Sequence, residues 1–462
     1  MLEVKPRPNI VIFMADTLRA DRLGCYGYEA HPTSPAIDAA ARDGLMFERA
    51  FAAAPWTLPS HGSLFTGLSP SKHGATDVTL QLDERHTTLA SRLAGLGYRT
   101  VAFTPHNAWL SQSTGLMRGF QTHLGPKHRV ACDRAESAAD ANSPRRRALG
   151  FEGSQIAQFA EHVLAGAADD ERPLFLFLHS MVNHEPYRPA AQSWAKAGVG
   201  RPDDDLLGYL QDEFKAYRAN PHTVTPGHAA ALSRIYDACV ATVDEVFRQV
   251  TRAVERHLGW DSTILVFTSD HGQNLGEHGM FSHWLCLFDT LLHVPLIIFP
   301  RWREVPARVS RPVPQKGLFR TLLRLAGDAH VEDGGLLEMA AGRAPFPDCV
   351  TAEHDDPVTT LKQIRTYNPG YHKPELEAAK KAVRTERYKY VLHATGTEYL
   401  YDLESDPAEQ HNVLRQNRKG ADGLRERLLT ELGGFRERAE PADAEETLDE
   451  GVLANLRALG YC

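Results

Sequence analysis

The sequence lacks several features that would place it in a specialised class of protein. Its 462 residues include six cysteines but no CxxC pair, so we expect neither a zinc ribbon nor a disulfide framework. No apolar run reaches membrane-spanning length, and the N-terminus has no apolar segment like that of a secretory signal. The net charge of −8 indicates neither a nucleic-acid partner nor an anionic membrane. We therefore expect a cytoplasmic protein with reduced thiols and no membrane anchor.

The composition is that of a globular protein. Hydrophobic residues make up 42% of the chain and charged residues 24%, and the length is sufficient for one large core and a smaller one. Short apolar runs are continuous rather than alternating, which is typical of strands buried on both faces of a parallel sheet. Because helix-like segments separate these runs, the sequence predicts an α/β fold with a mostly parallel central sheet flanked by helices. The runs are Ile10–Met14, Thr100–Phe103, Leu174–Leu178, Thr263–Phe267 and Leu296–Phe299.

The segments between the predicted strands are of two kinds. Apolar residues recur at helical spacing from Ala229 to Val254, and Leu318–Leu325 repeats that pattern, so both are predicted to be helices covering the sheet. Pro126–Gly150 is predicted to be a surface insertion. Tyr187–Pro226 is rich in proline and aspartate, and we expect it to form a rim or lid beside a site.

After Gly342 the predicted strands become shorter. Ala382–Leu392 and Glu398–Leu403 are predicted to form shorter strands with a turn at Ala394–Thr397 between them, and a helical tail ends the chain. We therefore expect an α/β domain at residues 1–342 and a smaller antiparallel α+β subdomain at residues 343–462.

Polar residues follow four of the predicted strands. In an open α/β sheet the ligand site lies beyond the carboxyl ends of the strands, so these residues are expected to converge on one crevice. His179, which directly follows the run 174–178, is instead expected to be structural. The converging residues are Asp16, Thr104–Asn107, Asn183-His184 and Ser269–Gly272.

The segment Trp56–Gly67 predicts a short helix at this crevice. Pro59 suits its first turn and Gly67 suits its end. The hydroxyl of Thr57 is then expected to face the backbone N–H groups and the positive end of the helix dipole, where a tetrahedral anion binds well. A threonine before an apolar run is also common as an ordinary helix cap. The segment therefore indicates either phosphate or sulfate chemistry, or a cap alone.

Together these motifs resemble the sulfatase-like branch of the alkaline phosphatase superfamily, which includes sulfatases, phosphonate monoester hydrolases and lipoteichoic acid synthase-like phosphotransferases. The resemblance implies an alkaline phosphatase-like fold for the α/β domain. It rests on Pro8–Val11, Asp16–Asp21, Gly24–Gly27, Trp56–Gly67, Ser269–Gly272, Gly276–Gly279 and Tyr401–Gln410.

The sequence departs from the sulfatase pattern at the nucleophile. Sulfatases of this family carry Cys-x-Pro-x-Arg or Ser-x-Pro-x-Arg, and the first residue is oxidised to formylglycine. Here the matching residues are Thr57, Pro59 and His61. A threonine cannot give that aldehyde, and the arginine that helps to hold sulfate is replaced. The family's Gly-Lys-x-His block also has no counterpart, and His106 and Asn107 stand in its region. We therefore expect an enzyme without formylglycine.

The resemblance implies one divalent metal ion, held by Asp16, Thr57, Asp270 and His271. The family's usual Asp-Asp pair is Asp16-Thr17 here, and its later Asp-Asn pair is Asp270-His271. An imidazole in place of an oxygen ligand moves the preference from calcium towards manganese or zinc. We expect manganese, with zinc, calcium and magnesium as alternatives.

The same replacements resemble the phosphotransferase members, which implies a threonine nucleophile. Thr57 would attack phosphorus in line and form a phosphothreonine intermediate, which water or an acceptor alcohol then resolves. His184 and His106 are the catalytic histidines that this implies, as substrate-binding or acid groups. The remaining substrate-binding candidates are His61, Asn107 and His283.

Three functions follow from the sequence. The first is a metal-dependent hydrolase or phosphotransferase acting on phosphomonoesters, phosphodiesters or phosphonate esters of a small anionic molecule. The second is a sulfatase that lacks formylglycine, and the third is a non-catalytic binding protein on the same fold. Retention of all four metal-shell residues favours an enzyme. The sequence does not name the substrate and leaves the oligomeric state open, including a homo-oligomer.

Overall fold

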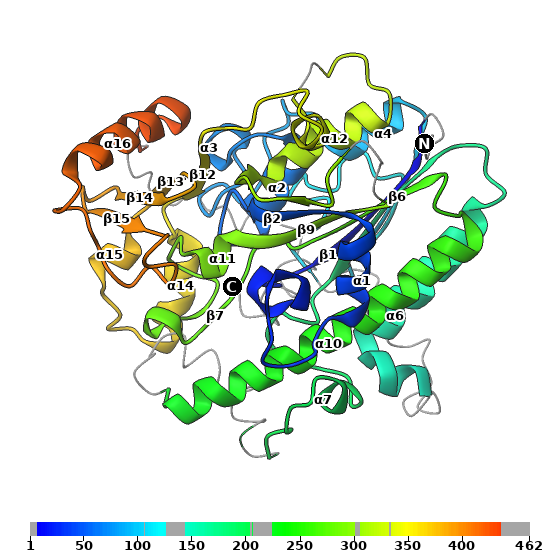
Figure 1. The fold of residues 1–462 in the computed structure, drawn as a ribbon, viewed down its shortest axis with the longest axis horizontal. Coiled ribbons are helices and arrows are strands. Elements are labelled where there is room, and N and C mark those ends of the chain that lie inside the picture. The colour runs from blue at the N-terminus through cyan, green and yellow to red at the C-terminus, as the bar shows by residue number, and fades with distance from the viewer. Residues whose placement is uncertain are drawn as a thin grey trace.

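The computed structural model describes residues 7–105, 107–125, 144–203, 206, 224–300, 305–331 and 334–435, with the backbone alone at 144–151 and 363. Its centre is a nine-stranded sheet of order β10-β2-β9-β6-β1-β5-β3-β4, with β11 also paired to β2. Figure 1 labels β2, β9, β6 and β1 of this sheet. The strands are β1 (Asn9–Ala15), β2 (Leu45–Phe51), β3 (Arg99–Phe103), β4 (Thr122–Leu124), β5 (Leu174–Ser180), β6 (Thr263–Thr268), β9 (His293–Phe299), β10 (Arg308–Val309) and β11 (Val313–Pro314).

The sheet is mostly parallel, which confirms the predicted fold class. The strands β6, β1, β5, β3 and β4 all run in one direction. Strand β9 runs antiparallel to both β6 and β2, so the apolar run Leu296–Phe299 is a strand but not a parallel one. Because β1, β5, β3 and β6 are parallel, their carboxyl ends lie at the same edge of the sheet.

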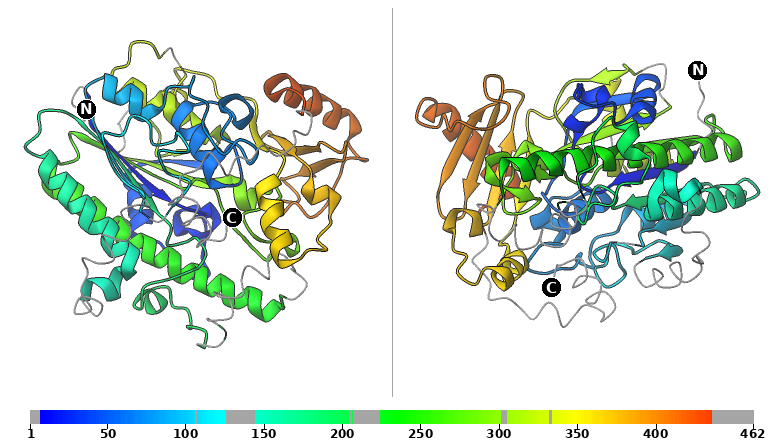
Figure 2. Two further views of the ribbon diagram at one scale, coloured as in Figure 1. Left: turned by 180° about the vertical axis from the view of Figure 1, so that it is seen from behind. Right: turned by 90° about the horizontal axis from the view of Figure 1, so that it is seen from below.

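Helices cover both faces of the sheet, as Figures 1 and 2 show. On one face lie α1 (Pro35–Asp43), α6 (Pro144–Ala167) and α10 (Pro226–His257). On the other lie α2 (Thr57–Thr66), α4 (Leu89–Gly95) and α12 (Leu318–Leu325). The helices predicted at 229–254 and 318–325 are confirmed. Within the described ranges, none of the helices has the length and apolar character needed to cross a membrane.

The structure corrects one of the predicted connectors. Residues 144–150, assigned to a surface insertion, form the first turns of helix α6. The preceding residues 126–143 lie outside the described part of the chain. In the predicted rim segment 187–226, helix α7 (Ser193–Lys196) is present, and residues 204–205 and 207–223 are outside the description.

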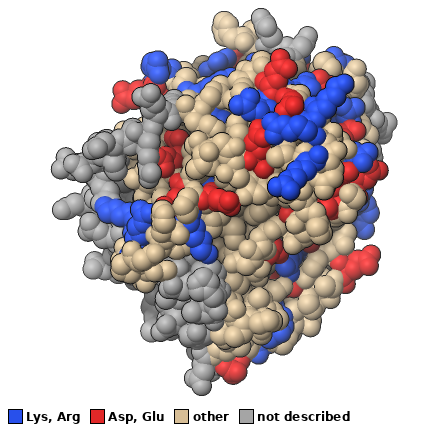
Figure 3. Space-filling view, turned by 90° about the vertical axis from the view of Figure 1, so that its left-hand side faces the viewer, with Lys and Arg blue, Asp and Glu red and all other residues tan. Residues whose placement is uncertain are grey.

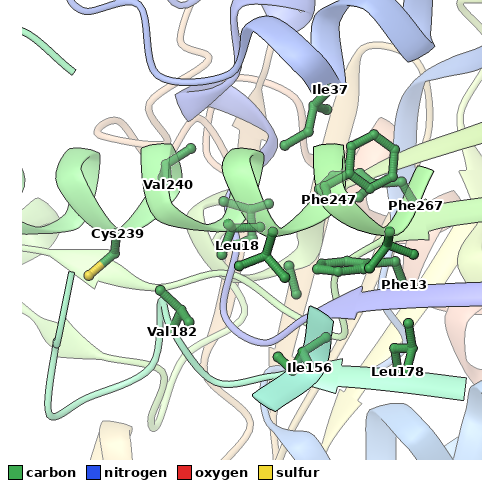
Figure 4. Close-up of a cluster of buried hydrophobic side chains, with 14 of the residues drawn as sticks. Phe13, Leu18, Ile37, Ile156, Leu178, Val182, Cys239, Val240, Phe247 and Phe267 are labelled. Atoms are coloured by element: carbon green, nitrogen blue, oxygen red, sulfur yellow. The ribbon is translucent and has the colours of Figure 1, made fainter. Parts of the chain in front are cut away.

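The core explains why the apolar runs are continuous. Along β1, Val11, Phe13 and Ala15 pack beneath α10, whereas Ile10, Ile12 and Met14 pack on the opposite face. All six side chains are fully buried. Phe13 packs against Phe247 of α10 and Phe267 of β6, with ring centroids 5.7 and 5.8 Å away, and those two rings lie 4.9 Å apart (Figure 4). A strand covered on both faces needs apolar residues at consecutive positions, as the sequence has.

The C-terminal part forms a separate antiparallel sheet of order β12-β13-β14-β15, followed by helix α16 (Arg418–Leu432). Residues 382–392, predicted as strand, belong to two strands with a tight turn at 385–387, and β12 is an additional strand that the sequence pattern did not reveal. The domain boundary after Gly342 stays a prediction. The strands are β12 (Val350–His354), β13 (Lys380–Arg384), β14 (Tyr388–His393) and β15 (Glu398–Asp402).

Shorter elements complete the described chain. They are α3 (Pro70–His73), α11 (Asp289–Leu292), α13 (Leu336–Ala340), α14 (Val358–Tyr367), α15 (Pro374–Glu377), the hairpin β7 (Asn274–Leu275) and β8 (Phe281–Ser282), and the 3-10 turns η1 (Ala20–Arg22), η2 (Gly24–Tyr26), η6 (Glu277–Gly279) and η7 (Gln315–Gly317).

The surface on the C-terminal side mixes charges of both signs, as Figure 3 shows. Exposed pairs there include Arg418 with Asp422 at 2.9 Å and Arg427 with Asp348 at 2.5 Å. Such solvated pairs contribute little to folding stability.

A buried ion cluster joins the small sheet to the main body. Lys389 of β14 is fully buried, and its Nζ lies 2.7 Å from Asp289 Oδ1 and 2.8 Å from Glu409 Oε1. Asp289 begins helix α11 beside the central sheet, and its other carboxylate oxygen lies 3.1 Å from Arg384 Nε. The ammonium group of Lys389 therefore depends on carboxylates from two parts of the chain.

Asp289→Ala is expected to destabilise the fold by about 3–5 kcal/mol, because it leaves Lys389 buried with one of its two carboxylates removed. Urea unfolding gives the loss of free energy. Asp348→Ala is the matched control, since its side chain is exposed and pairs with Arg427 in solvent, and it should cost no more than about 1 kcal/mol. An equal loss of unfolding free energy in the two variants would contradict a large stabilising contribution from the buried cluster.

Candidate active site

The loop after β1 holds the first carboxylate, Asp16. Thr17 has a φ of 59°, a left-handed conformation that a β-branched residue rarely adopts. In this conformation the Thr17 N–H donates to Asp270 Oδ1 at 3.2 Å. The hydroxyl of Tyr236 on α10 donates to the Thr17 carbonyl at 2.6 Å and accepts from the Arg19 N–H at 2.9 Å. The loop that carries Asp16 is thus fixed from two sides.

The loop after β6 holds Asp270 and His271. A Cβ added to Gly272 would lie 2.0 Å from the Thr290 carbonyl oxygen, so only glycine fits at this close approach. The His271 N–H donates to Asp270 Oδ1 at 2.9 Å. Ser60 of α2 donates its hydroxyl to the Asp270 carbonyl at 2.6 Å, which ties this loop to the helix that begins at Thr57.

Helix α2 begins and ends as predicted. Thr57 is its first residue, Pro59 lies in the first turn, and Gly67 terminates it with a φ of 71°. Trp56 occupies the position before the helix, so Thr57 is not the capping residue. The Thr57 hydroxyl oxygen lies 3.4 Å from His271 Nε2. The only predicted hydroxyl nucleophile therefore stands where the helix N-terminus meets the loop after β6.

Asp16, Asp270 and His271 form a buried group of potential metal ligands. His271 Nε2 lies 3.3 Å from Asp270 Oδ2 and 3.8 Å from Asp16 Oδ1. His271 Nδ1 is 3.0 Å from the Gly272 carbonyl, which places the ring proton on Nδ1 and leaves the Nε2 lone pair towards the carboxylates. Neither Asp16 Oδ1 nor Asp270 Oδ2 has a hydrogen-bond partner. Because unpaired buried carboxylate oxygens are costly, these donors fit a divalent cation.

The electrostatics of Asp16 follow from its neighbours. Burial alone would raise its pKa, but the imidazoles of His179, His184 and His271 hold the pKa of this carboxyl well below its usual range. Asn107 donates from Nδ2 to Asp16 Oδ2 at 3.0 Å, so this predicted substrate-binding residue orients a carboxylate. Asp16 is therefore ionised, as a metal ligand must be.

Two further histidines lie against the carboxylates. His179 Nε2 is 3.3 Å from Asp16 Oδ2, and the His61 ring centroid is 5.3 Å from that of His179. Burial lowers the pKa of His61 to about 4, so its imidazole is neutral near pH 7 and does not supply the charge of the arginine it replaces. His179, which was expected to be structural, therefore contacts a predicted metal ligand. The register Met14↔His179 places it level with the end of β1, a signal that only the paired strands provide.

The remaining predicted histidines lie near this group or outside the described residues. The His283 ring centroid is 4.6 Å from His271 and 5.1 Å from His184, so the three imidazoles form a row. His283 Nδ1 lies 2.9 Å from Gln273 Oε1. His184 Nδ1 lies 2.5 Å from the Glu185 carbonyl. His106 is outside the described residues.

A sheet edge that groups carboxylates, imidazoles and a hydroxyl at a helix N-terminus is suited to a divalent cation and an anionic ligand. The family model described as sulfatase matches residues 8–328, which is more than half of the chain. The chain therefore belongs to the sulfatase family, a family of hydrolases, and the predicted family relationship is confirmed.

Its relatives are distant but extend along most of the chain. The Delta 4,5-hexuronate-2-O-sulfatase of Bacteroides thetaiotaomicron is 24% identical over 448 residues, covering 89% of this chain and 86% of the relative. A multifunctional alkaline phosphatase superfamily protein of Trinickia caryophylli is 22% identical over 483 residues, covering 88% and 91%. The structure of the phosphonate monoester hydrolase of Agrobacterium radiobacter matches with a TM-score of 0.71 at 23% identity, covering 92% of this chain and 95% of that chain. This likeness confirms the alkaline phosphatase-like fold.

Proposed function

We propose that this protein is a metal-dependent phosphoester hydrolase or phosphotransferase with Thr57 as its nucleophile. The observation that carries the proposal is the position of the Thr57 hydroxyl, 3.4 Å from His271 Nε2 at the first residue of α2. Next to it lie the buried carboxylate oxygens of Asp16 and Asp270 that have no hydrogen-bond partner. A nucleophile at a helix N-terminus and beside a cation site stands where the negative charge of an ester can be stabilised.

Asp16, Asp270 and His271 would hold the divalent cation, with Thr57 completing the set. When bound, the cation would neutralise charge on the ester and favour the deprotonated form of the Thr57 hydroxyl. An imidazole beside two carboxylates supports manganese or zinc over calcium. We propose manganese, with zinc, calcium and magnesium as alternatives to be tested by metal content.

The proposed reaction has two steps on this chain's own residues. In the first, Thr57 Oγ1 loses its proton to solvent and forms a bond to phosphorus as the bond to the leaving oxygen breaks, and His184 or His106 donates a proton to that oxygen. In the second, water or an acceptor alcohol gives its proton to that histidine as it attacks the phosphothreonine, and the released Thr57 oxygen regains a proton from solvent. His61, Asn107 and His283 are the proposed substrate-binding residues, and Asn107 also holds Asp16 in place.

A sulfate ester is the second candidate substrate class. It is favoured by the family and by the 2-O-sulfatase among the relatives, whereas the phosphonate monoester hydrolase supports a phosphorus ester. The secondary alcohol of Thr57 cannot become formylglycine, so sulfate cleavage would have to use the hydroxyl itself. A binding protein without turnover is the third candidate.

Parallel assays with nitrophenyl esters in the presence of Mn²⁺ separate the three candidates. We expect the protein to cleave a phosphate monoester, phosphodiester or phenylphosphonate ester faster than the sulfate ester. Cleavage of the sulfate ester alone would replace the phosphoester assignment with the sulfatase one. Metal-loaded protein that cleaves none of the four esters would favour a binding protein.

A further inference from the structure

We propose that the site holds a second divalent cation, bound by His61 and His179 and bridged to the first by Asp16 and Asp270. This inference rests on the first cation position of the proposed function, and it assigns His61 to a second cation in place of the direct substrate contact given for it there. A second cation also changes what the site can bind, because it adds positive charge beside Thr57.

The first observation is a second group of donor residues, which contains different histidines from the first group. Donor atoms of His61, His179 and Asp270 all lie within 4.8 Å of one another, and all three residues are almost completely buried. His61 Nε2 has no hydrogen-bond partner, and the polar contact given for His179 Nε2 is the Asp16 carboxylate at 3.3 Å. Buried ring nitrogens without a partner are costly, and a metal ion is one of the few ligands that pairs with a neutral imidazole lone pair.

Backbone contacts fix the chemical form of His61. Its Nδ1 lies 2.9 Å from the carbonyl oxygen of Thr57, which places the ring proton on Nδ1 and leaves Nε2 as an unprotonated donor. A carbonyl that holds one nitrogen while the other binds metal is the usual support of a metal-binding histidine. The same contact ties the second group directly to the residue that carries the nucleophile.

The two carboxylates face both groups. Asp16 directs Oδ1 towards His271 Nε2 at 3.8 Å and Oδ2 towards His179 Nε2 at 3.3 Å. Asp270 Oδ2 lies 3.3 Å from His271 Nε2 and 3.6 Å from His61 Nδ1. Asp16 thus lies between one imidazole of the first group and one of the second, and Asp270 belongs to both donor groups, with its contact to His61 made at the protonated Nδ1. This is the arrangement of carboxylates shared by a pair of cations about 3.5–4 Å apart.

The charge balance of the site also supports a second cation. Asp16 and Asp270 together cancel the charge of one divalent cation, and His61 and His179 add no charge when they bind as neutral imidazoles. A single cation would leave the donor set neutral, whereas a second would supply net positive charge for an anionic ester.

Metal stoichiometry tests the proposal. Full-length protein stripped of metal and equilibrated with Mn²⁺ is expected to retain two equivalents by elemental analysis. His61→Ala and His179→Ala are each expected to retain one, and His330→Ala, at an exposed histidine, is the control that should retain two. Electron paramagnetic resonance gives a second measurement, since two Mn²⁺ ions sharing carboxylates give a coupled spectrum and a single ion does not.

The outcomes separate this proposal from the proposed function. One equivalent in the unmodified protein would overturn the second cation, and weaker binding of that one ion in His61→Ala or His179→Ala would mean that five residues surround a single ion. No bound Mn²⁺ in the unmodified protein would overturn the first cation position as well. His61→Gln and His179→Gln, checked by circular dichroism, replace the alanine variants if those do not fold.

Discussion

Thr57→Ala is expected to lower kcat for ester cleavage by about 10³-fold or more, because it removes the attacking oxygen and leaves only binding and electrostatic contributions. The substitution leaves Asp16, Asp270 and His271 unchanged, so we expect the metal content of the variant to stay close to that of the parent. Steady-state kinetics with the preferred nitrophenyl ester, together with elemental analysis of the same sample, measure both quantities.

Two further variants make this result specific. Thr57→Ser keeps a hydroxyl at the same helix N-terminus and should stay within about tenfold of the parent. Thr66→Ala removes a hydroxyl at the other end of α2, where it donates to the Gly62 carbonyl at 2.7 Å, and should leave kcat unchanged. If Thr57→Ala turns over nearly as fast as the parent and the Thr66→Ala control, Thr57 is not the nucleophile.

Asp270→Ala is expected to abolish metal retention and to lower turnover by about 10³-fold or more, because one buried carboxylate faces the ring nitrogens of both His61 and His271. In the parent, Mn²⁺ should raise the melting temperature, since a ligand that binds only the folded state stabilises it. In Asp270→Ala that rise should be absent. Calorimetry with and without Mn²⁺ measures it.

The control for this loss is Asp43→Ala, at an exposed aspartate at the end of α1. It should retain the metal, the Mn²⁺-dependent rise in melting temperature and the turnover of the parent. An Asp270→Ala variant that keeps stoichiometric metal would show that the cation lies elsewhere. That result would also contradict the assignment of Asp16 and His271 as metal ligands.

The parts of the site that could be predicted from sequence are those next to strong local signals. Asp16 and Asp270 each follow a continuous apolar run, and a run buried on both faces can only end at the edge of the sheet. Thr57 could be placed because Pro59 and Gly67 mark the two ends of its helix. These positions depend on the chain close to them, and the structure has them as expected.

The parts that could not be predicted depend on contacts between distant segments. His179 looks like the last residue of a buried strand, and only the register of β5 on β1 brings it to Asp16. Lys389 looks like a solvated lysine in an alternating strand, and only the fold supplies Asp289 and Glu409 from elsewhere in the chain. The start of α6 was missed because its first turn is rich in arginine and carries no apolar periodicity.

The most direct test of the central claim is the covalent state of Thr57 during turnover. A reaction with the preferred phosphorus ester is quenched in acid, which phosphothreonine survives, and the peptides are analysed by tandem mass spectrometry. The account predicts one added phosphoryl group on the peptide containing Thr57, located on that residue and absent without substrate. Rapid turnover with unmodified Thr57, or with the phosphoryl group on another residue, would contradict it.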